Sequence, residues 1–336
     1  MSITLFVLLM VILSALIFEF INGFHDSANA IATIVSTRVL SPRNAIIFGA
    51  SLEFLGAFFG THVAKTISSG ILTVEAPPQT LIICALLAAI MWNLITWYFG
   101  IPSSSSHALI GGLIGAGIAF KGINALHITG IIKKVIIPMF TSPVLGFFIG
   151  FFFMLLLVWL VHKRNPDRIN KWFKKLQLIS SGLMAFSHGS NDAQKTMGII
   201  TLALFSFGFL KSAEHIPVWV IVICAFTMSA GVMSGGWKII RTMGSKVIKL
   251  KPIHGFAAET SAAIIILTCS SLGIPISTTH VISTAIMGVG STLRLSAVKW
   301  SLVKNILSAW VMTIPICMTL AFILYSLLKN LEFLKG

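Results

Sequence analysis

The chain has 336 residues, of which 56% are hydrophobic and only 10% are charged. A soluble domain carries about a quarter charged residues, so this composition excludes an ordinary soluble protein and predicts an all-α polytopic membrane protein. The formal net charge of +15 does not require nucleic acid as a partner. The Lys and Arg residues fall in short segments between apolar runs, where basic charge sets orientation in the lipid bilayer.

The chain begins with an apolar stretch over residues 1–18, which lacks a basic leading region and a small-residue cleavage site. We therefore expect the first membrane span here rather than a removed signal peptide. The four cysteines lie inside apolar runs without paired spacing. They are expected to be buried hydrophobic residues, and neither a disulfide nor a structural metal site is expected.

Ten apolar runs follow one another along the chain, and several approach the roughly 20 residues that a helix needs to cross hydrocarbon. The runs lie near residues 3–20, 44–64, 80–99, 103–120, 138–161, 178–205, 216–235, 256–272, 276–291 and 301–328. About ten membrane crossings are therefore expected. The fourth and ninth runs either cross fully or form re-entrant Ser/Thr-rich hairpins that enter the membrane and return.

A pair of polar motifs occurs twice in these apolar surroundings. The first copy has an acid-bearing motif at residues 23–30 (GFHDSANA) and a Ser-rich motif at 101–107 (IPSSSSH). The second copy has the corresponding motifs at 189–195 (GSNDAQK) and 274–280 (IPISTTH). Broken polar segments at matching places in two halves of a membrane protein indicate the binding site of a transporter.

The spacing of the motifs predicts two inverted-topology repeats. The copies are 166 residues apart at the acid motif, from Asp26 to Asp192, and 173 apart at the Ser-rich motif. Each half then holds five crossings, and because five is odd, the second copy is inserted upside down. The expected divisions are a first repeat at 1–161, a short basic cytoplasmic linker at 162–177 and a second, inverted repeat at 178–336.

The positions of the basic residues support this topology. The proposed inner loops hold 16 Lys and Arg residues and the outer ones hold seven, while Lys195 lies within a span. Residues 68–79 contain no basic residue, whereas the matching segment 237–254 contains five, as opposite insertion predicts. Both termini are then expected to face outside.

Five of the nine acidic residues fall within or at the edge of apolar runs. They are Glu19, Asp26, Glu53, Asp192 and Glu259. A carboxylate at the bilayer centre costs at least about 2.5–3.5 kcal/mol on insertion scales, so such groups usually face a cavity, an ion or a partner. The two aspartates are related by the repeat. The glutamates at 53 and 259 are not, and structural pairing is an alternative for them, as an interfacial position is for the glutamate at 19.

The Gly and Asn residues around the two aspartates predict helix breaks, at which carbonyl groups turn inward. Oxygen ligands of this kind suit a small cation. The candidate coupling-ion ligands are Asp26, Asn29, Glu53, Asp192 and Glu259, with Asn191 as a further oxygen donor. The alternative is that the carboxylates are neutralised by protons or by Lys195, which could also attract a substrate.

The Ser/Thr-rich motifs have the complementary chemistry. Pro102 and Pro275 are expected in the first turn of a helix, which places the hydroxyl groups that follow at the helix N-terminus. Free N–H groups and the positive end of the helix dipole bind anions there, so two facing N-termini could enclose a tetrahedral oxyanion. The alternative is ordinary helix capping or Ser-lined helix packing.

Four histidines accompany the motifs. His107 and His280 end the Ser-rich motifs and could fix the hydroxyl geometry or carry protons, or be satisfied interior histidines. His25 and His188 flank the acid motifs, and the sequence assigns them no role. Thr96, a polar residue within an apolar run, is more typical of helix packing than of a ligand.

These motifs resemble those of the PiT family of inorganic phosphate transporters. The family signature Gly-Ala-Asn-Asp-Val-Ala-Asn-Ala is similar to residues 23–30, which differ from it at Phe24, His25 and Ser27. The Gly-Phe-His-Asp form, together with residues 187–195, is most similar to the bacterial low-affinity phosphate permease branch. The resemblance extends over nearly the whole chain and includes both Pro-Ser/Thr-His segments.

The resemblance implies a symporter in which phosphate lies between two hairpin tips, with ions beside it. Asp26 and Asp192 would be essential, and Glu53 and Glu259 would match glutamates that are important in eukaryotic members. A transport domain would move against a scaffold. The expected substrate-binding residues are Ser104, Ser105, Ser106, Ser277, Thr278 and Thr279, joined by Asn191, Gln194 and Lys195.

The expected location is the cell membrane, with inorganic phosphate and the lipid bilayer as partners, and a homodimer is compatible with this assignment. No cofactor is expected. The coupling cation is H⁺ or Na⁺, and a divalent metal could travel with the phosphate. The short linker leaves no room for the large central cytoplasmic domain of some members.

The motifs leave functions other than phosphate symport open. A sulfate permease of the same fold is one alternative, and a passive anion channel is another. An intramembrane hydrolase that uses a buried serine is disfavoured, because the sequence has no Gly-x-Ser-x-Gly elbow. The sequence also lacks a Gly-Lys-Ser/Thr nucleotide loop, so a cation gradient is the expected energy source.

Overall fold

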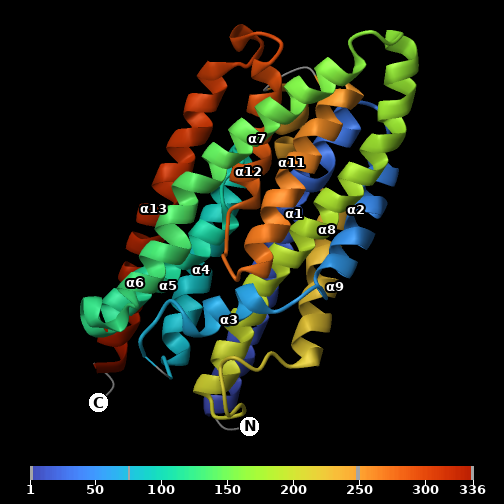
Figure 1. Ribbon diagram of the computed structural model, residues 1–336. Helices are drawn as coiled ribbons and strands as arrows, with labels where there is room; N and C mark the ends of the chain where they lie inside the picture. The colour runs from blue at the N-terminus through green and yellow to red at the C-terminus, as the bar shows by residue number, and fades with distance from the viewer. Residues whose placement is uncertain (1–2, 75, 247–249, 334–336) are drawn as a thin grey trace.

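The protein is a bundle of long helices (Figure 1). The computed structural model describes the whole chain except residues 1–2, 75, 247–249 and 334–336. The α-helices are α1 (Ile3–Ser36), α2 (Pro42–Gly56), α3 (His62–Ser69), α4 (Gln79–Phe99), α5 (Ser105–Lys121), α6 (Ile128–Ile131), α7 (Ile137–Val161), α8 (Pro166–Ser206), α9 (Val218–Ser234), α10 (Trp237–Arg241), α11 (Pro252–Ser271), α12 (Thr278–Ser291) and α13 (Trp300–Phe333). Short 3-10 or π-helical segments are η1 (Gly122–Ala125), η2 (Ile132–Ile136), η3 (Thr242–Lys246) and η4 (Leu295–Ala297).

Six helical segments in the described part of the chain are long and apolar enough to cross a membrane. They are Leu5–Ser36, Gln79–Phe99, Ser105–Ala125, Ile128–Val161, Pro252–Ser271 and Trp300–Asn330. Val218–Ser234 and Trp237–Gly244 form a pair bent by 62°, which makes a seventh span if both parts are counted together. The fold is therefore that of an all-helical polytopic membrane protein.

The number of candidate spans is smaller than the ten crossings expected from the sequence. Helix α2 has 15 residues and α12 has 14, so each is shorter than a full crossing of the hydrocarbon requires. Helix α8 is long enough, with 41 residues, but charged and polar side chains occupy much of its length. Apolar content along the chain thus overestimates the number of simple spans.

The predicted helix breaks at the two acid motifs are wrong. Helix α1 is continuous through residues 23–30, and α8 is continuous through residues 189–195. The glycines serve close helix packing instead. A Cβ atom on Gly23 would lie 2.3 Å from the carbonyl oxygen of Met228 in α9, and one on Gly189 would lie 2.2 Å from that of Glu53 in α2.

The actual interruptions lie at the Ser/Thr-rich motifs. Helix α4 ends at Phe99 and is followed by Gly100, which has φ of 65°, and the chain then runs without regular structure to α5. After α11, Gly273 has φ of 68°, and a similar stretch leads to α12. Glycine adopts this left-handed backbone without steric cost, which permits both abrupt helix ends.

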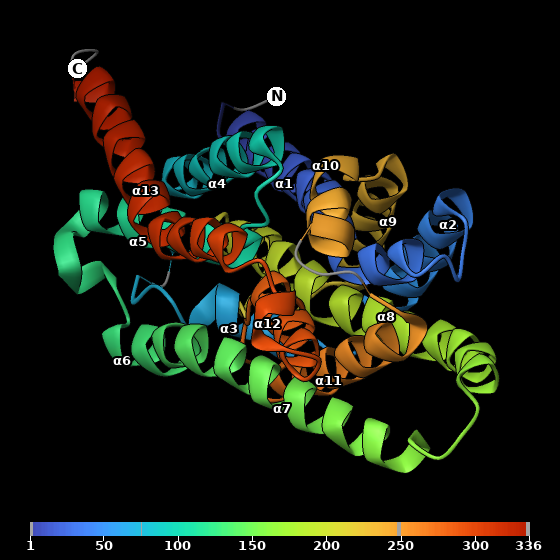
Figure 2. The same ribbon diagram turned by 90° about the horizontal axis from the view of Figure 1, so that it is seen from above.

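Several of the most extensive helix contacts join opposite halves of the chain. Helix α9 packs on α1, and α2 packs on α8. The short helices follow the same rule, because α10 contacts α1 and α3 contacts α8. At the other side of the bundle, α13 packs against α5 and α7 packs against α12, which is visible in Figure 2.

The two chain ends lie at one end of the bundle, whereas the α7–α8 and α12–α13 connections lie at the other end (Figure 1). The outer faces of α7 and α13 expose large apolar side chains, including Phe140, Phe152, Trp159 and Leu327. Charged and polar side chains are instead buried at the centre, on α1 and α8. An apolar exterior around a polar interior is the arrangement that a lipid environment requires.

Candidate functional site

Each Ser/Thr-rich motif ends in a capped helix N-terminus. The Ser104 hydroxyl accepts a hydrogen bond from the His107 N–H at 3.2 Å, which caps α5. The Ser277 hydroxyl accepts one from the His280 N–H, also at 3.2 Å, which caps α12. The following hydroxyl side chains therefore lie in the first helical turn, beside N–H groups that have no partner within the helix.

The expectation that Pro102 and Pro275 occupy the first helical turn is wrong. Helices α5 and α12 begin at Ser105 and Thr278, so each proline lies two residues before the capping residue. The N-cap position is taken by a hydroxyl residue, which stabilises the helix end directly. The prolines instead belong to the irregular segments that approach the two helices.

The two helix beginnings are in contact. The Ser106 hydroxyl on α5 donates to the carbonyl oxygen of Ile276, two residues before α12, at 3.0 Å. The imidazole rings of His107 and His280 meet edge to face, with centroids 4.9 Å apart. The second ring also stacks on Trp310 of α13, whose indole N–H donates to the Pro102 carbonyl at 2.9 Å. These histidines thus pack at the junction of the two hairpin segments.

Asp26 of α1 lies where the two helix beginnings converge. Its Oδ2 accepts a hydrogen bond from Ser105 of α5 at 3.1 Å, and its Oδ1 accepts one from Thr279 of α12 at 3.3 Å. The neighbouring His25 places Nδ1 2.7 Å from Oδ1 of the same carboxylate. The carboxylate is almost fully buried, so these polar partners replace water around it.

A second set of contacts joins the same hydroxyls to Asp192 of α8. The Asn29 amide donates to Thr279 Oγ1 at 2.9 Å and to Thr278 Oγ1 at 3.3 Å. Thr278 in turn donates to Asp192 Oδ2 at 3.4 Å. The two repeat-related aspartates are therefore linked through one pair of threonines at the start of α12.

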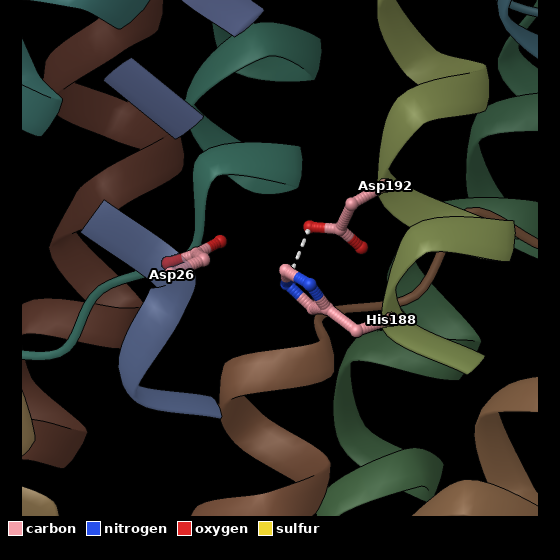
Figure 3. A group of neighbouring side chains, drawn as sticks. All are labelled: Asp26, His188 and Asp192. Atoms are coloured by element: carbon pink, nitrogen blue, oxygen red, sulfur yellow. Dashed lines mark ion pairs between the residues drawn. The ribbon is translucent and has the colours of Figure 1, made fainter. Parts of the chain in front are cut away.

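Charged side chains from α2 and α8 surround Asp192. Lys195 Nζ lies 2.7 Å from its Oδ1, and His188 Nε2 lies 3.5 Å from its Oδ2. His188 Nδ1 is also 3.2 Å from Oε1 of Glu53. Figure 3 shows the His188 ring between the two aspartates. Ligand atoms of Asp26, His188 and Asp192 lie within 4.8 Å of one another, close enough to hold a metal cation.

Two of the expected substrate-binding residues on α8 lie at the edges of this cluster. Gln194 Oε1 accepts hydrogen bonds from the backbone N–H groups of Val63 at 2.8 Å and Ala64 at 3.2 Å, so this side chain caps α3. The Asn191 amide lies 3.5 Å from the Ile274 carbonyl, and its Oδ1 has no hydrogen-bond donor among the described residues.

Glu259 of α11 has a separate environment. Its Oε1 accepts hydrogen bonds from Thr33 and from Gln177, the latter at 3.3 Å, and its Oε2 accepts one from Ser180. Of the two candidate glutamates, Glu53 therefore joins the aspartate cluster through a histidine, whereas Glu259 is held by neutral donors from α1 and α8.

The sequence assigned no role to several residues that the structure brings into the cluster. His25 Nε2 lies 3.0 Å from Thr96 Oγ1 of α4, and Thr96 lies 2.8 Å from Ser103 Oγ. His188 lies one helical turn before Asp192, and this spacing of four residues places both on one face of α8. That spacing was visible in the sequence, but the link to Thr96 was not, because 71 residues separate the partners.

Apolar outer faces, paired helix N-termini and a buried charged cluster define a multi-pass membrane transporter. A family model described as "Phosphate transporter family" matches residues 22–321. The chain belongs to this family, and it is a transporter of the cell membrane rather than an enzyme.

Curated relatives and a solved structure cover nearly the full chain. The chain is 47% identical to a probable low-affinity inorganic phosphate transporter of Bacillus subtilis (strain 168), over 98% of this chain and 99% of that protein. It is also 47% identical to one of Rhizobium meliloti (strain 1021), over 93% of each. A solved structure described as "The sodium-dependent phosphate transporter" is similar with a TM-score of 0.86 and 29% identity, over 96% of this chain and 99% of that one.

Proposed function

We propose that this protein is a secondary symporter that moves inorganic phosphate across the cell membrane together with H⁺ or Na⁺. The observation that carries the proposal is the position of Asp26. Its carboxylate accepts hydrogen bonds from hydroxyl groups at the starts of both α5 and α12. A candidate cation ligand and two candidate anion-binding helix ends thus meet at one buried point. The names of the relatives in Bacillus subtilis and Rhizobium meliloti support phosphate as the cargo.

Phosphate would bind between the first turns of α5 and α12. The N–H groups there and the positive ends of the helix dipoles favour an anion. Four hydroxyl side chains line the same place, namely Ser105, Ser106, Thr278 and Thr279, while Ser104 and Ser277 hold the helix ends in shape. No fixed arginine is needed in such a site, which leaves the phosphate free to depart.

The cation would bind beside the phosphate, in the cluster that contains Asp26 and Asp192. Both carboxylates are buried, and a bound phosphate would add further negative charge next to them. A cation on the Asp26 carboxylate offsets this repulsion. The cation also competes for the carboxylate oxygens that accept hydrogen bonds from Ser105 and Thr279. The two hydroxyl groups can then donate to phosphate oxygens instead. Each ligand thereby favours binding of the other, which is the condition for symport.

The matched packing of helices supports an inverted repeat as the framework of this site. Helices α1 and α8 would be equivalent, as would α5 and α12, with the repeats at residues 1–161 and 178–336 as the sequence predicts. The crossed pairs α5–α13 and α7–α12 then join the two halves. In this arrangement the segments before α5 and α12 would be the re-entrant hairpin tips.

Phosphate uptake into vesicles that contain the purified protein tests the proposal. Sodium, proton and magnesium gradients are imposed separately, and labelled phosphate is measured inside. Accumulation that follows a sodium or proton gradient supports symport. Uptake that only equilibrates and ignores every cation gradient would instead assign a passive anion channel, and competition by excess sulfate would assign a sulfate permease.

A further inference from the structure

The acid motifs of α1 and α8 are duplicated, but they differ at the position three residues after each aspartate. The spacing of 166 residues that places Asp26 on Asp192 also places Asn29 on Lys195. Both residues follow their aspartate by three positions, so each lies on the same helix face as its own carboxylate. One half therefore has a neutral amide where the other half has an ammonium group.

Lys195 forms a buried ion pair. Its Nζ lies 2.7 Å from Asp192 Oδ1, and its side chain is 0% exposed. A buried ammonium group must be paired, because its removal from water is otherwise far too costly. The same argument applies to Asp192, for which Lys195 is the nearest cationic group that the structure describes.

Asn29 leaves its half of the site open to an external ligand. Its amide nitrogen donates to Thr278 and Thr279, whereas its Oδ1 has no hydrogen-bond donor in the described part of the chain. The partners of Asp26 are His25 and the hydroxyl groups of Ser105 and Thr279. Among the described residues, no Lys or Arg side chain forms an ion pair with Asp26. A carboxylate and a free amide oxygen on one helix face are ligands that a small cation prefers.

We propose that Lys195 is a built-in cation that occupies one of the two cation positions created by the duplicated aspartate motif. The inference rests on the proposed symport and deepens it. Two equivalent aspartates would each take a cation from solution, but here the ammonium group fills the position at Asp192. Only the position at Asp26 is then filled from solution. Each phosphate is therefore accompanied by one external cation fewer than in a site where both aspartates bind a cation from solution.

Replacement of Lys195 by asparagine, which restores the residue of the first half, tests this assignment. Without the ammonium group, Asp192 keeps only His188 as a partner of positive charge, and His188 is shared with Glu53. A sodium ion or a proton must then take the place of the ammonium group. The reversal potential of phosphate flux in vesicles gives the charge moved per phosphate. We expect this ratio to rise by one in Lys195→Asn. The exposed lysine Lys211 gives the control, and Lys211→Asn should keep the original ratio.

A stability measurement covers the case in which Lys195→Asn does not transport. The thermal midpoint of the purified variant should be lower than that of the native protein in choline buffer at neutral pH. Added sodium or a lower pH should restore it, because ligands that bind only the folded state stabilise it. The double variant Asp192→Asn/Lys195→Asn has no uncompensated charge and should not respond in this way.

An unchanged charge ratio in Lys195→Asn, with uptake still driven by a cation gradient, would overturn the built-in cation and leave the symport in place. So would a lowered thermal midpoint that neither sodium nor acid restores. Failure of the proposed function is distinct, since it would be seen as uptake by the native protein that ignores every cation gradient.

Discussion

Asp26 accepts hydrogen bonds from hydroxyl groups on α5 and α12, two helices that are far apart in the sequence. Ser105 and Thr279 each have a single hydroxyl proton, and in this structure both protons point to the carboxylate. A phosphate between the helices would need the same protons. The carboxylate and the phosphate therefore compete for these two donors. A cation on the carboxylate weakens its hydrogen bonds and so raises the affinity for phosphate.

The Ser105 hydroxyl is therefore expected to contribute to phosphate binding. A hydrogen bond to a charged group is worth about 1.5–3 kcal/mol, so Ser105→Ala should weaken phosphate binding by roughly tenfold or more. Equilibrium binding of labelled phosphate to the purified protein measures this change. Ser51 provides a control, because its exposed hydroxyl bonds only to the carbonyl oxygen of Ile47 within α2. Equal affinities for both variants would contradict a phosphate site at α5.

At the scale of helices, continuity of α1 and α8 determines where the charged residues lie. Both helices pass straight through their acid motifs, and glycines there let a neighbouring helix approach the backbone. The aspartates are thus held on rigid helices. The chain is interrupted instead before α5 and α12, so any local rearrangement on ligand binding is expected at the hydroxyl-bearing segments.

The close approach of α2 to α8 predicts a strong effect of Gly189→Ala. The added Cβ would lie 2.2 Å from the backbone oxygen of Glu53, which is fixed in α2. Overpacking of this kind typically costs about 1–3 kcal/mol, so the thermal midpoint should fall by several degrees. Gly182→Ala is the matched control on the same helix. Its Cβ would meet side-chain atoms alone, Leu52 Cδ1 at 3.0 Å and Phe48 Cζ at 3.1 Å, and side chains can move by a few tenths of an ångström where a backbone oxygen cannot. Equal midpoints for both variants would refute the packing role.

The sequence predicted helix type and motif pairing better than helix ends. Duplicated acid and Ser/Thr-rich motifs identified the residues that converge at the centre, because polar groups inside apolar runs are rare. The same Gly and Asn residues suggested breaks in α1 and α8 that do not exist. A glycine that permits a break and one that permits close packing look alike until the neighbouring helix is known.

Contacts between side chains that are far apart in the chain could not be predicted from the sequence either. Gln194 is predicted to bind substrate, and the structure shows in addition that its amide oxygen caps α3. Nothing in the sequence places α3 against α8. The same holds for Glu259, whose three donors come from α1 and α8. Such roles depend on tertiary packing, which short motifs do not encode.

At the scale of the whole molecule, the termini lie at one end of the bundle and the α7–α8 connection lies at the other (Figure 1). Of the predicted linker at 162–177, residues 166–177 belong to α8. The linker's Lys and Arg residues lie in the α7–α8 connection and the first turns of α8, at the end away from the termini. Because basic loops remain in the cytoplasm, both termini are predicted to face outside. An inverted repeat in which each half makes an odd number of crossings requires that both termini lie on the same side of the membrane.

Epitope tags on the two termini test the orientation. Antibodies should label both tags on intact cells from which any outer barrier has been removed, and permeabilisation should not increase the signal. A tag inserted at residues 162–165, between α7 and α8, is the control and should become accessible only after permeabilisation. Labelling of one terminus alone would contradict the inverted repeat, and two cytoplasmic termini would reverse the proposed orientation.

The dependence of phosphate affinity on cation concentration, in the native protein and in Asp26→Asn, tests the coupling most directly. Labelled phosphate is titrated into purified protein over a range of sodium concentrations and, separately, of pH. The native protein should bind phosphate about tenfold or more tightly at high cation concentration, a typical coupling between two sites. Asp26→Asn, which has no carboxylate for the cation, should bind phosphate with an affinity that hardly changes. A variant that keeps the full cation dependence, or a native protein without any, would contradict coupling through Asp26.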